Sequence, residues 1–331
     1  MQNFLIFLFV LPCLGLTQTA MSQENVSPVV GKIICLDAGH GGTAKTDSFR
    51  AGPTGEREEW INLRVALLLQ KLLEKKGAKV VMTRTTDDTI SLTRRAKIAK
   101  ENNSDLFLSI HHNATADPKV NFPIIYFHGN ASENKASVIL GKEIGKALRE
   151  KLYQGSTPVS IVSDHVIFSR SGTGVLRGAY GIPGVIAEAS FFTNPGEEVR
   201  LKQTEYNHRE ASAYLAALEN YFKETIPPIR EKNTIIEVPP FRAFQGSERM
   251  NKTALLWYED FIKGKELIKD NSNESLEKAY ELFTRSARSF PDSYVAAECH
   301  RYRVNLLRKL GRAEEAQKEE QRVQEFYVPL E

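Results

Sequence analysis

Residues 32–42 read KIICLDAGHGG, and this stretch decides how the first part of the chain is interpreted. Ile33 to Leu36 form a short continuous apolar run, which is typical of a strand buried on both faces of a sheet. The run leads into a glycine-dense loop with His40 at its centre, and glycine lets the backbone approach a ligand closely. The stretch therefore predicts a buried strand that delivers one imidazole to a sheet edge. A lone histidine of this kind is more often structural than a ligand.

Strand-like and helix-like segments alternate along residues 31–222. The expected strands are 32–36, 78–83, 105–110, 123–127 and 184–187, and the expected helices are 58–76, 92–102, 133–153 and 197–222. This alternation predicts an α/β fold in which a mainly parallel sheet is flanked by helices. Ligands of such sheets bind outside the carboxyl ends of the strands, which is where His40 falls.

The first residues of the chain have the composition of a targeting segment. Residues 4–16 are almost entirely apolar, a run too short for the ~20 residues of a membrane span but suited to a secretory signal. We therefore expect residues 1–20 to be a signal peptide and the protein to be exported to the periplasm, the cell envelope or the extracellular space. No integral membrane segment is expected after removal of the signal.

The second part of the chain predicts a separate helical unit. The first domain is expected over residues 29–224, and two proline pairs mark residues 225–249 as a linker. Residues 250–331, called the tail below, predict a small all-α domain with helices over 251–269, 274–290, 293–310 and 312–326.

The tail partly matches a known helical repeat. Ala279, Phe283, Ala287 and Pro291 lie near the spacing of a tetratricopeptide repeat. Fewer than three such repeats rarely form a stable array alone. We therefore expect a tetratricopeptide-like tail that docks on the first domain or on a protein partner.

The overall composition excludes other classes of protein. Apolar residues make up 41% and charged residues 26% of the 331 residues, the balance of a globular protein. The net charge of +3, with Lys and Arg spread along the chain, argues against a nucleic-acid partner. The cysteines at 13, 35 and 299 have no paired spacing, so neither a disulfide framework nor a thiolate zinc site is expected.

A second predicted strand also ends in histidine. Residues 105–113 read DLFLSIHHN, which places an imidazole from this strand at the same edge as His40. A catalytic zinc ion takes three protein ligands and leaves one position for water. A third ligand should therefore exist, and the helix expected over 58–76 offers candidates.

Helical periodicity separates the acidic residues at the start of that helix. The apolar stripe is formed by Ile61, Val65, Leu68, Leu69 and Leu72. Glu58 falls on the side of this stripe, whereas Glu59 and Glu56 are expected to face solvent. A buried carboxylate needs a cation or strong donors, and zinc would meet that need. The alternative is that Glu58 caps the helix, since acidic residues are favoured in a first turn. The spacing alone favours neither the metal ligand nor the helix cap.

A third strand ends in a carboxylate. Residues 184–195 read GVIAEASFFTNP, with Glu188 after a short apolar run. Glu188 would serve as a fourth metal ligand, a structural acceptor or the general base for a zinc-activated water. We favour the base, because a catalytic site must leave the zinc ion an open position.

Taken in order, these motifs resemble a known family. They are LDAGHGG at 36–42, EEWINL at 58–63, MTR at 82–84, LFLSIHHNA at 106–114 and GVIAEASFFTNPGEE at 184–198. Together they are similar to the zinc-dependent N-acetylmuramoyl-L-alanine amidases of bacterial cell walls, the Amidase_3 type. The resemblance covers about residues 32–222. The segment between His40 and Glu58 looks longer than in the family.

The resemblance implies a set of roles. His40, Glu58 and His111 take the roles of ligands to one catalytic Zn²⁺, and Glu188 takes that of the catalytic carboxylate. Asn113 and Arg177 lie near the motifs and are weaker candidates for substrate contact. The implied reaction is hydrolysis of the amide between N-acetylmuramic acid and L-alanine in peptidoglycan, which releases stem peptides from glycan. Two alternatives stay open: a zinc peptidase or amidase acting on another cell-wall bond, and a non-enzymatic cell-wall-binding adaptor.

The remaining ionisable residues receive structural interpretations. His128, His165, His208 and His300 lack a recognisable strand-end setting, and Asp164-His165 is expected to be a solvated pair more often than a lining of the cleft. Arg94, Arg95 and Lys97 fit a solvated helix face.

Overall fold

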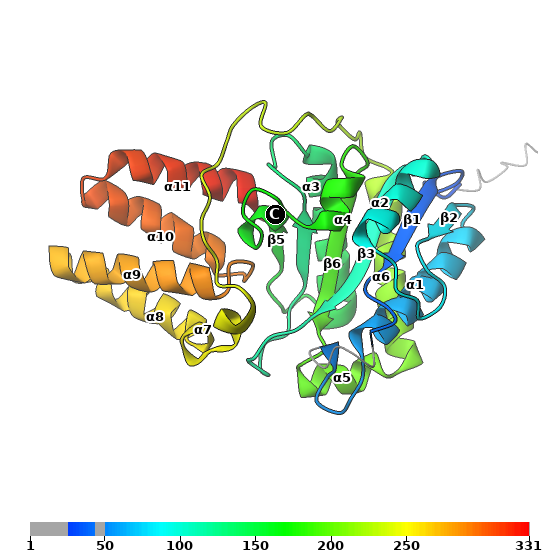
Figure 1. Cartoon of the computed structure of the whole chain (residues 1–331), viewed down its shortest axis with the longest axis horizontal. Helices are drawn as coiled ribbons and strands as arrows, with labels where there is room; N and C mark the ends of the chain where they lie inside the picture. The colour runs from blue at the N-terminus through cyan, green and yellow to red at the C-terminus, as the bar shows by residue number, and fades with distance from the viewer. Residues whose placement is uncertain (1–25, 44–49, 331) are drawn as a thin grey trace, which may run out of the picture.

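A single mixed sheet forms the centre of the protein. The computed structural model describes residues 26–43 and 50–330, so the expected signal peptide lies outside the described residues. Seven strands follow the order β2-β1-β3-β6-β4-β5-β7 (Figure 1). Their bounds are β1 Ile33–Ala38, β2 Lys79–Met82, β3 Leu106–Asn113, β4 Ile124–Phe127, β5 Ser160–Ser163, β6 Gly184–Phe191 and β7 Tyr327–Val328.

Helices connect the strands and form the tail. In the first domain they are α1 Glu58–Lys75, α2 Leu92–Glu101, α3 Lys135–Tyr153, α4 Gly174–Ala179, α5 Pro195–Leu201 and α6 Thr204–Tyr221, with a short 3-10 helix η2 at Asp164–Val166. In the linker and tail they are the 3-10 helix η3 Gly246–Met250, α7 Lys252–Leu255, α8 Trp257–Leu267, α9 Asn273–Ser289, α10 Ala296–Lys309 and α11 Ala313–Phe326.

Most strand pairs are parallel. β1 pairs in parallel with β2 and β3, β3 with β6, and β4 with β5, whereas β4 runs antiparallel to β6 and β7 antiparallel to β5. The prediction of an α/β fold with a mainly parallel sheet, flanked by helices and followed by a helical tail, is confirmed. The reversed direction of β4 and β5 puts their carboxyl ends at the sheet edge opposite to those of β1, β3 and β6.

Helices cover both faces of the sheet. α1, α3 and α6 pack on one face, where Val65, Leu140 and Tyr214 belong to the buried core. α2, α4 and tail helices cover the other face, whose core continues from Phe107 into the tail. Because side chains alternate along a strand, Asp37, His111 and Glu188 all project towards this second face.

The helix expected over 197–222 is two helices. Gln203 is in an extended conformation at the start of α6, which breaks the helical path after α5. Side chains satisfy the groups at the break: Asn207 Nδ2 donates to the carbonyl of Leu201 at 2.9 Å, and Tyr206 donates to Glu197 Oε1 at 2.8 Å. Helical periodicity alone does not reveal such a break, because the apolar stripe continues across it.

The tail docks on the first domain. β7 extends the sheet by pairing with β5, and the ring of Phe122 lies 5.9 Å from that of Phe290 and 5.1 Å from that of Tyr294. The likeness of the tail to tetratricopeptide repeats remains a prediction, and so do the expected domain boundaries. No helix within 26–43 and 50–330 is long and apolar enough to cross a membrane.

A buried carboxylate joins the strands that lead to the site. Asp37 on β1 is 1% exposed and accepts hydrogen bonds from Thr83 Oγ1 at 2.7 Å and Ser109 Oγ at 2.6 Å. Arg95 of α2 donates to the same carboxylate at 2.7 Å. Burial opposes ionisation of Asp37, but Arg95 and the two hydroxyl donors outweigh it and lower the pKa of this carboxyl.

Two buried arginines hold the loop that carries His40. Arg84 donates to the carbonyls of Ala38 and Gly39, both at 2.8 Å, and Arg95 donates to Ala38 at 2.7 Å and also to the carbonyl of His40. His40 has a φ of 57°, in the left-handed region that residues with a side chain rarely adopt. The prediction that Arg95 lies on a solvated face was wrong: this residue is 3% exposed, because its charge is needed against Asp37.

Replacing Asp37 with alanine should therefore destabilise the protein by about 3–5 kcal/mol at pH 7, because Arg95 would be left buried without its counter-charge. The matched control is Arg94→Ala, which breaks the exposed pair with Glu101 and should cost less than about 1 kcal/mol. Urea unfolding of both variants provides the measurement. Since the folded pKa of Asp37 is lowered, its contribution is present above its unfolded pKa of about 3.9 and is lost as pH falls through the folded value. Equal losses in the two variants at pH 7 would contradict this account.

Candidate metal centre and catalytic carboxylate

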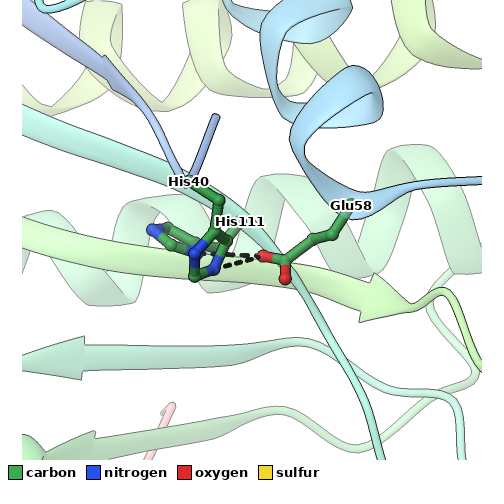
Figure 2. Close-up of side chains that lie close together, drawn as sticks. All are labelled: His40, Glu58 and His111. Carbon is green, nitrogen blue, oxygen red and sulfur yellow. Dashed lines mark hydrogen bonds and ion pairs between the residues drawn. The ribbon is translucent and has the colours of Figure 1, made fainter. Parts of the chain in front are cut away.

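His40 and His111 meet at the carboxyl edge of the sheet. His40 follows β1 and His111 lies near the end of the neighbouring strand β3, so parallel pairing brings both to one edge. Their ring centroids are 4.7 Å apart with the planes at 87° (Figure 2). Gly39 makes this approach possible, because a Cβ atom there would lie 2.3 Å from the ring of His111.

Glu58, the first residue of α1, completes the group. Its Oε1 lies 3.1 Å from Nε2 of His40 and 3.0 Å from Nδ1 of His111, and both contacts are drawn in Figure 2. The Glu58 side chain is 7% exposed, and its other contacts include Asn62, which donates to Oε1 at 3.2 Å. The carboxylate therefore points at the two imidazoles, which favours the ligand alternative over the helix cap.

These three side chains fit a divalent metal ion. One potential ligand atom from each lies within 4.8 Å of the other two. Two imidazole nitrogens and one carboxylate oxygen form a donor set that suits catalytic zinc. A buried carboxylate also requires positive charge nearby. Arg50 supplies some of it, since its guanidinium contacts the His40 ring and lies 3.9 Å from Glu58 Oε2.

The neighbouring acidic residues do not face solvent as expected. Glu59 is fully buried and accepts a hydrogen bond from Arg57 Nε at 2.7 Å. The side chain of Glu56 is 12% exposed and accepts from Arg64 at 2.7 Å. The helical wheel failed here because each carboxylate is covered and paired by an arginine close to it in the sequence.

His112 lies on the other face of the sheet from His111. It is 1% exposed, with Nδ1 2.8 Å from Asn62 Oδ1 and Nε2 3.0 Å from Glu210 Oε2. Although burial opposes protonation of His112, the carboxylate of Glu210 raises its pKa. The structure thus brings His111, and not His112, to the group with His40 and Glu58.

Glu188 stands beside this group on β6. It is the direct neighbour of His111 in the β3–β6 pairing, and its Oε2 is a buried atom with no hydrogen-bond partner among the described residues. Burial raises the pKa of Glu188 well above its usual range; Glu58 and Asp292 raise it further, whereas Arg50 lowers it. An unpaired oxygen of this kind is available to a water molecule or a substrate.

The tail contributes to the surroundings of Glu188, which the sequence did not reveal. Asp292, between α9 and α10, is fully buried and accepts hydrogen bonds from the hydroxyl of Tyr126 and from Arg249 at 3.2 Å. Its charge acts on Glu188 across the domain junction. Asp292 is about a hundred positions from Glu188 in the chain, and no local pattern links the two.

The two weaker candidates, Asn113 and Arg177, make local hydrogen bonds. The side chain of Asn113 accepts from the backbone N–H of Ala114 at 2.8 Å. Arg177 is exposed and donates to the carbonyls of Ser171 at 2.7 Å and Gly172 at 3.2 Å. A cavity of about 170 Å³ borders His40 and His111, and neither candidate is among its described lining residues.

The expectation of a solvated Asp164-His165 pair was wrong. Asp164 is fully buried and lies 2.9 Å from Nδ1 of His128, which directly follows β4. His128 therefore lies at a strand end, whereas the sequence analysis found no strand-end setting for it. The sequence does place metal-ligating residue types directly after β4 and β5. It does not reveal that these two strands run in the reversed direction.

Comparisons with known proteins agree with this fold and site. Residues 34–220 match the family model Amidase_3, described as N-acetylmuramoyl-L-alanine amidase. The chain is 28% identical over 217 residues to the germination-specific N-acetylmuramoyl-L-alanine amidase of Bacillus subtilis strain 168, covering 61% of this chain and 84% of that protein. It is 27% identical over 223 residues to the N-acetylmuramoyl-L-alanine amidase AmiA of Salmonella typhimurium strain LT2, covering 58% and 76%.

A solved amidase structure is similar to this fold. The CwlD amidase from Clostridioides difficile, solved in complex with the GerS lipoprotein, superposes with a TM-score of 0.51 at 26% identity, covering 58% of this chain and 99% of that one. The family match ends at residue 220, so the tail lies outside it. Because the family model covers more than half of the chain, this protein belongs to the Amidase_3 family of N-acetylmuramoyl-L-alanine amidases.

Proposed function

We propose that this protein is a zinc-dependent hydrolase that cleaves the amide between N-acetylmuramic acid and L-alanine in peptidoglycan. The observation that carries the proposal is the convergence of His40, Glu58 and His111 beside the unpaired oxygen of Glu188. The names of the two relatives compared above, both N-acetylmuramoyl-L-alanine amidases, support the choice of bond. Action on peptidoglycan agrees with the expected export of the protein to the cell envelope.

His40, Glu58 and His111 would hold the zinc ion. When bound there, zinc supplies a Lewis acid that polarises the scissile carbonyl and acidifies water. The three ligands come from a strand end, a neighbouring strand end and the first turn of a helix, so rigid elements fix their positions. The buried network of Asp37, Arg84 and Arg95 keeps the His40 loop in place.

Glu188 is proposed to act as the general base. Its environment in the described structure favours the protonated form, because burial and two nearby carboxylates raise its pKa. Positive charge beside Glu58 would favour the ionised form that a base requires. Ionised Glu188 would take a proton from the attacking water and pass it to the leaving nitrogen of L-alanine.

The tail is proposed to bind a protein partner. Several large apolar side chains on α7 and α8 are exposed, including Leu255 at 42%, Tyr258 at 45% and Ile262 at 40%. Exposed apolar side chains that cluster often mark protein interaction sites. Replacing Leu255 and Tyr258 with serine should abolish cross-linked complexes in cell-envelope extracts and leave peptidoglycan hydrolysis intact. Unchanged cross-links would reject this interface.

Two substitutions separate metal binding from proton transfer. Glu188→Ala should keep the zinc content of the wild type but lower turnover by roughly 10²–10⁴, the usual worth of a positioned general base. His40→Ala should lose one equivalent of zinc as well as turnover. Both are measured on purified protein by metal analysis and by release of peptide from purified sacculi. Full activity in Glu188→Ala would dismiss the assignment of the base.

The identity of the cleaved bond is measured by mass spectrometry of digested muropeptides. Cleavage at the proposed amide yields free stem peptides that begin with L-alanine, together with glycan chains that lack peptide. Fragments cut within the stem peptide would instead identify a peptidase. Binding to sacculi with no released fragment, in zinc-loaded protein, would identify an adaptor.

A further inference from the structure

A second cluster of metal-ligating side chains lies at the opposite edge of the sheet. His128 follows β4, while Asp164 and His165 follow β5, and both strands run antiparallel to β6. Their carboxyl ends therefore face away from the edge that carries His40 and His111. One potential ligand atom from each of His128, Asp164 and His165 lies within 4.8 Å of the other two.

The geometry of this cluster resembles that of the first. Nδ1 of His128 lies 3.1 Å from Asp164 Oδ1, and Nε2 of His165 lies 4.0 Å from the same oxygen. The two imidazole rings are 5.3 Å apart with their planes at 87°, against 4.7 Å and 87° for His40 and His111. In both clusters, one carboxylate oxygen faces two nearly perpendicular imidazoles.

A glycine also closes each cluster. At Gly172, which has a φ of 59°, a Cβ atom would lie 2.5–2.6 Å from the carboxylate oxygens of Asp164 and 2.6 Å from Cε1 of His128. Gly39 has the same relation to His111 in the first cluster. Only a glycine allows the backbone to come this close to the ligand atoms without displacing them.

Two buried polar atoms near this point lack partners. Nε2 of His165 is buried without a hydrogen-bond partner among the described residues, although the side chain as a whole is 12% exposed. The same holds for Oε2 of Glu133, a residue that is 1% exposed and whose charge acts on His165. Buried polar atoms are normally paired, so an unpaired nitrogen beside a carboxylate is available to a ligand such as a cation.

Thr173 donates hydrogen bonds to only one of the two carboxylate oxygens of Asp164. Thr173 donates its backbone N–H and its hydroxyl to Oδ2 of Asp164, at 2.7 and 2.8 Å. Nδ1 of His128 lies 2.9 Å from this oxygen and 3.1 Å from Oδ1, and Oδ1 is the oxygen that also faces His165. Asp164, the carboxylate of the cluster, is fully buried.

We propose that His128 Nδ1, Asp164 Oδ1 and His165 Nε2 bind a second divalent transition-metal ion of the zinc class. Two imidazoles and one carboxylate match zinc, cobalt or nickel better than the all-oxygen ligands preferred by calcium or magnesium. A cavity of about 120 Å³ borders His165, one of the three proposed ligands.

The site lies where the linker and the tail meet the first domain. Linker residue Thr234 donates its backbone N–H to Glu133 at 2.7 Å, and the ring of Phe326 at the end of α11 lies 5.6 Å from that of His165. A metal ion here would tie the β4–β5 edge to both segments. The second ion is therefore structural in this proposal and does not enter hydrolysis at Glu188.

Lys232 competes with a metal ion at this cluster, because it contacts the ring of His128. Its Nζ lies 3.2 Å from Nε2 of His128, the ring nitrogen that faces away from Asp164. When Nδ1 binds a metal, the proton of the neutral ring moves to Nε2, and the ammonium must leave. Lys232 is an exposed linker residue and can turn into solvent.

The test counts zinc equivalents in purified full-length protein after dialysis, by mass spectrometry of the metal. The wild type should retain two equivalents, His40→Ala one, His165→Ala one, and the double variant none. His165→Ala should keep peptidoglycan hydrolysis, and the substitution removes no hydrogen bond of Nε2, because this atom has no hydrogen-bond partner among the described residues. Added zinc should raise the thermal midpoint of His40→Ala but not that of the double variant.

Several outcomes would overturn the second site. They are one equivalent in the wild type, an unchanged zinc content in His165→Ala, and an equal loss in the control His208→Ala, which replaces an exposed histidine of α6. Lys232→Ala is a second variant that needs no buried substitution. It should tighten zinc binding at the second site, and an affinity unchanged from the wild type would count against the proposal. Because His40→Ala and His165→Ala remove different ions, failure of this proposal is distinguishable from failure of the proposed function.

Discussion

The geometry of the candidate site centres on one buried oxygen, Oε1 of Glu58. It lies within 3.1 Å of nitrogens from two imidazoles that belong to different strands. A carboxylate with a 7% exposed side chain is costly unless positive charge compensates it, and Arg50, 3.9 Å from Oε2, supplies only part of that charge. In the proposed function, a divalent cation shared by all three side chains would compensate this charge and could polarise an amide carbonyl.

The rest of the first domain positions the side chains around Glu58. Parallel pairing of β1, β3 and β6 sends His40, His111 and Glu188 to one edge. Because that edge is held by backbone hydrogen bonds and by the buried charge of Asp37, ligands from distant parts of the chain keep their relative positions. The tail adds to the same arrangement, since its Asp292 lies beside Tyr126 and raises the pKa of Glu188.

Much of this arrangement is predictable from the sequence, because its signals are local. The apolar runs before His40, His111 and Glu188 predicted strands, and the motifs after them predicted the family, which the comparison confirmed. The roles assigned to these residues remain predictions, although the structure brings the four side chains together. The failures concern contacts between distant residues: the burial of Arg95 depends on Asp37, and the pairing of His128 with Asp164 depends on two strands that reverse direction.

The central claim is that zinc occupies the point shared by His40, Glu58 and His111. Anomalous diffraction at the zinc absorption edge, from crystals of the full-length protein, tests it most directly. The account predicts a peak about 2.0–2.2 Å from Nε2 of His40, Nδ1 of His111 and Oε1 of Glu58. Absence of a peak at that point in zinc-soaked crystals of active protein would contradict the claim.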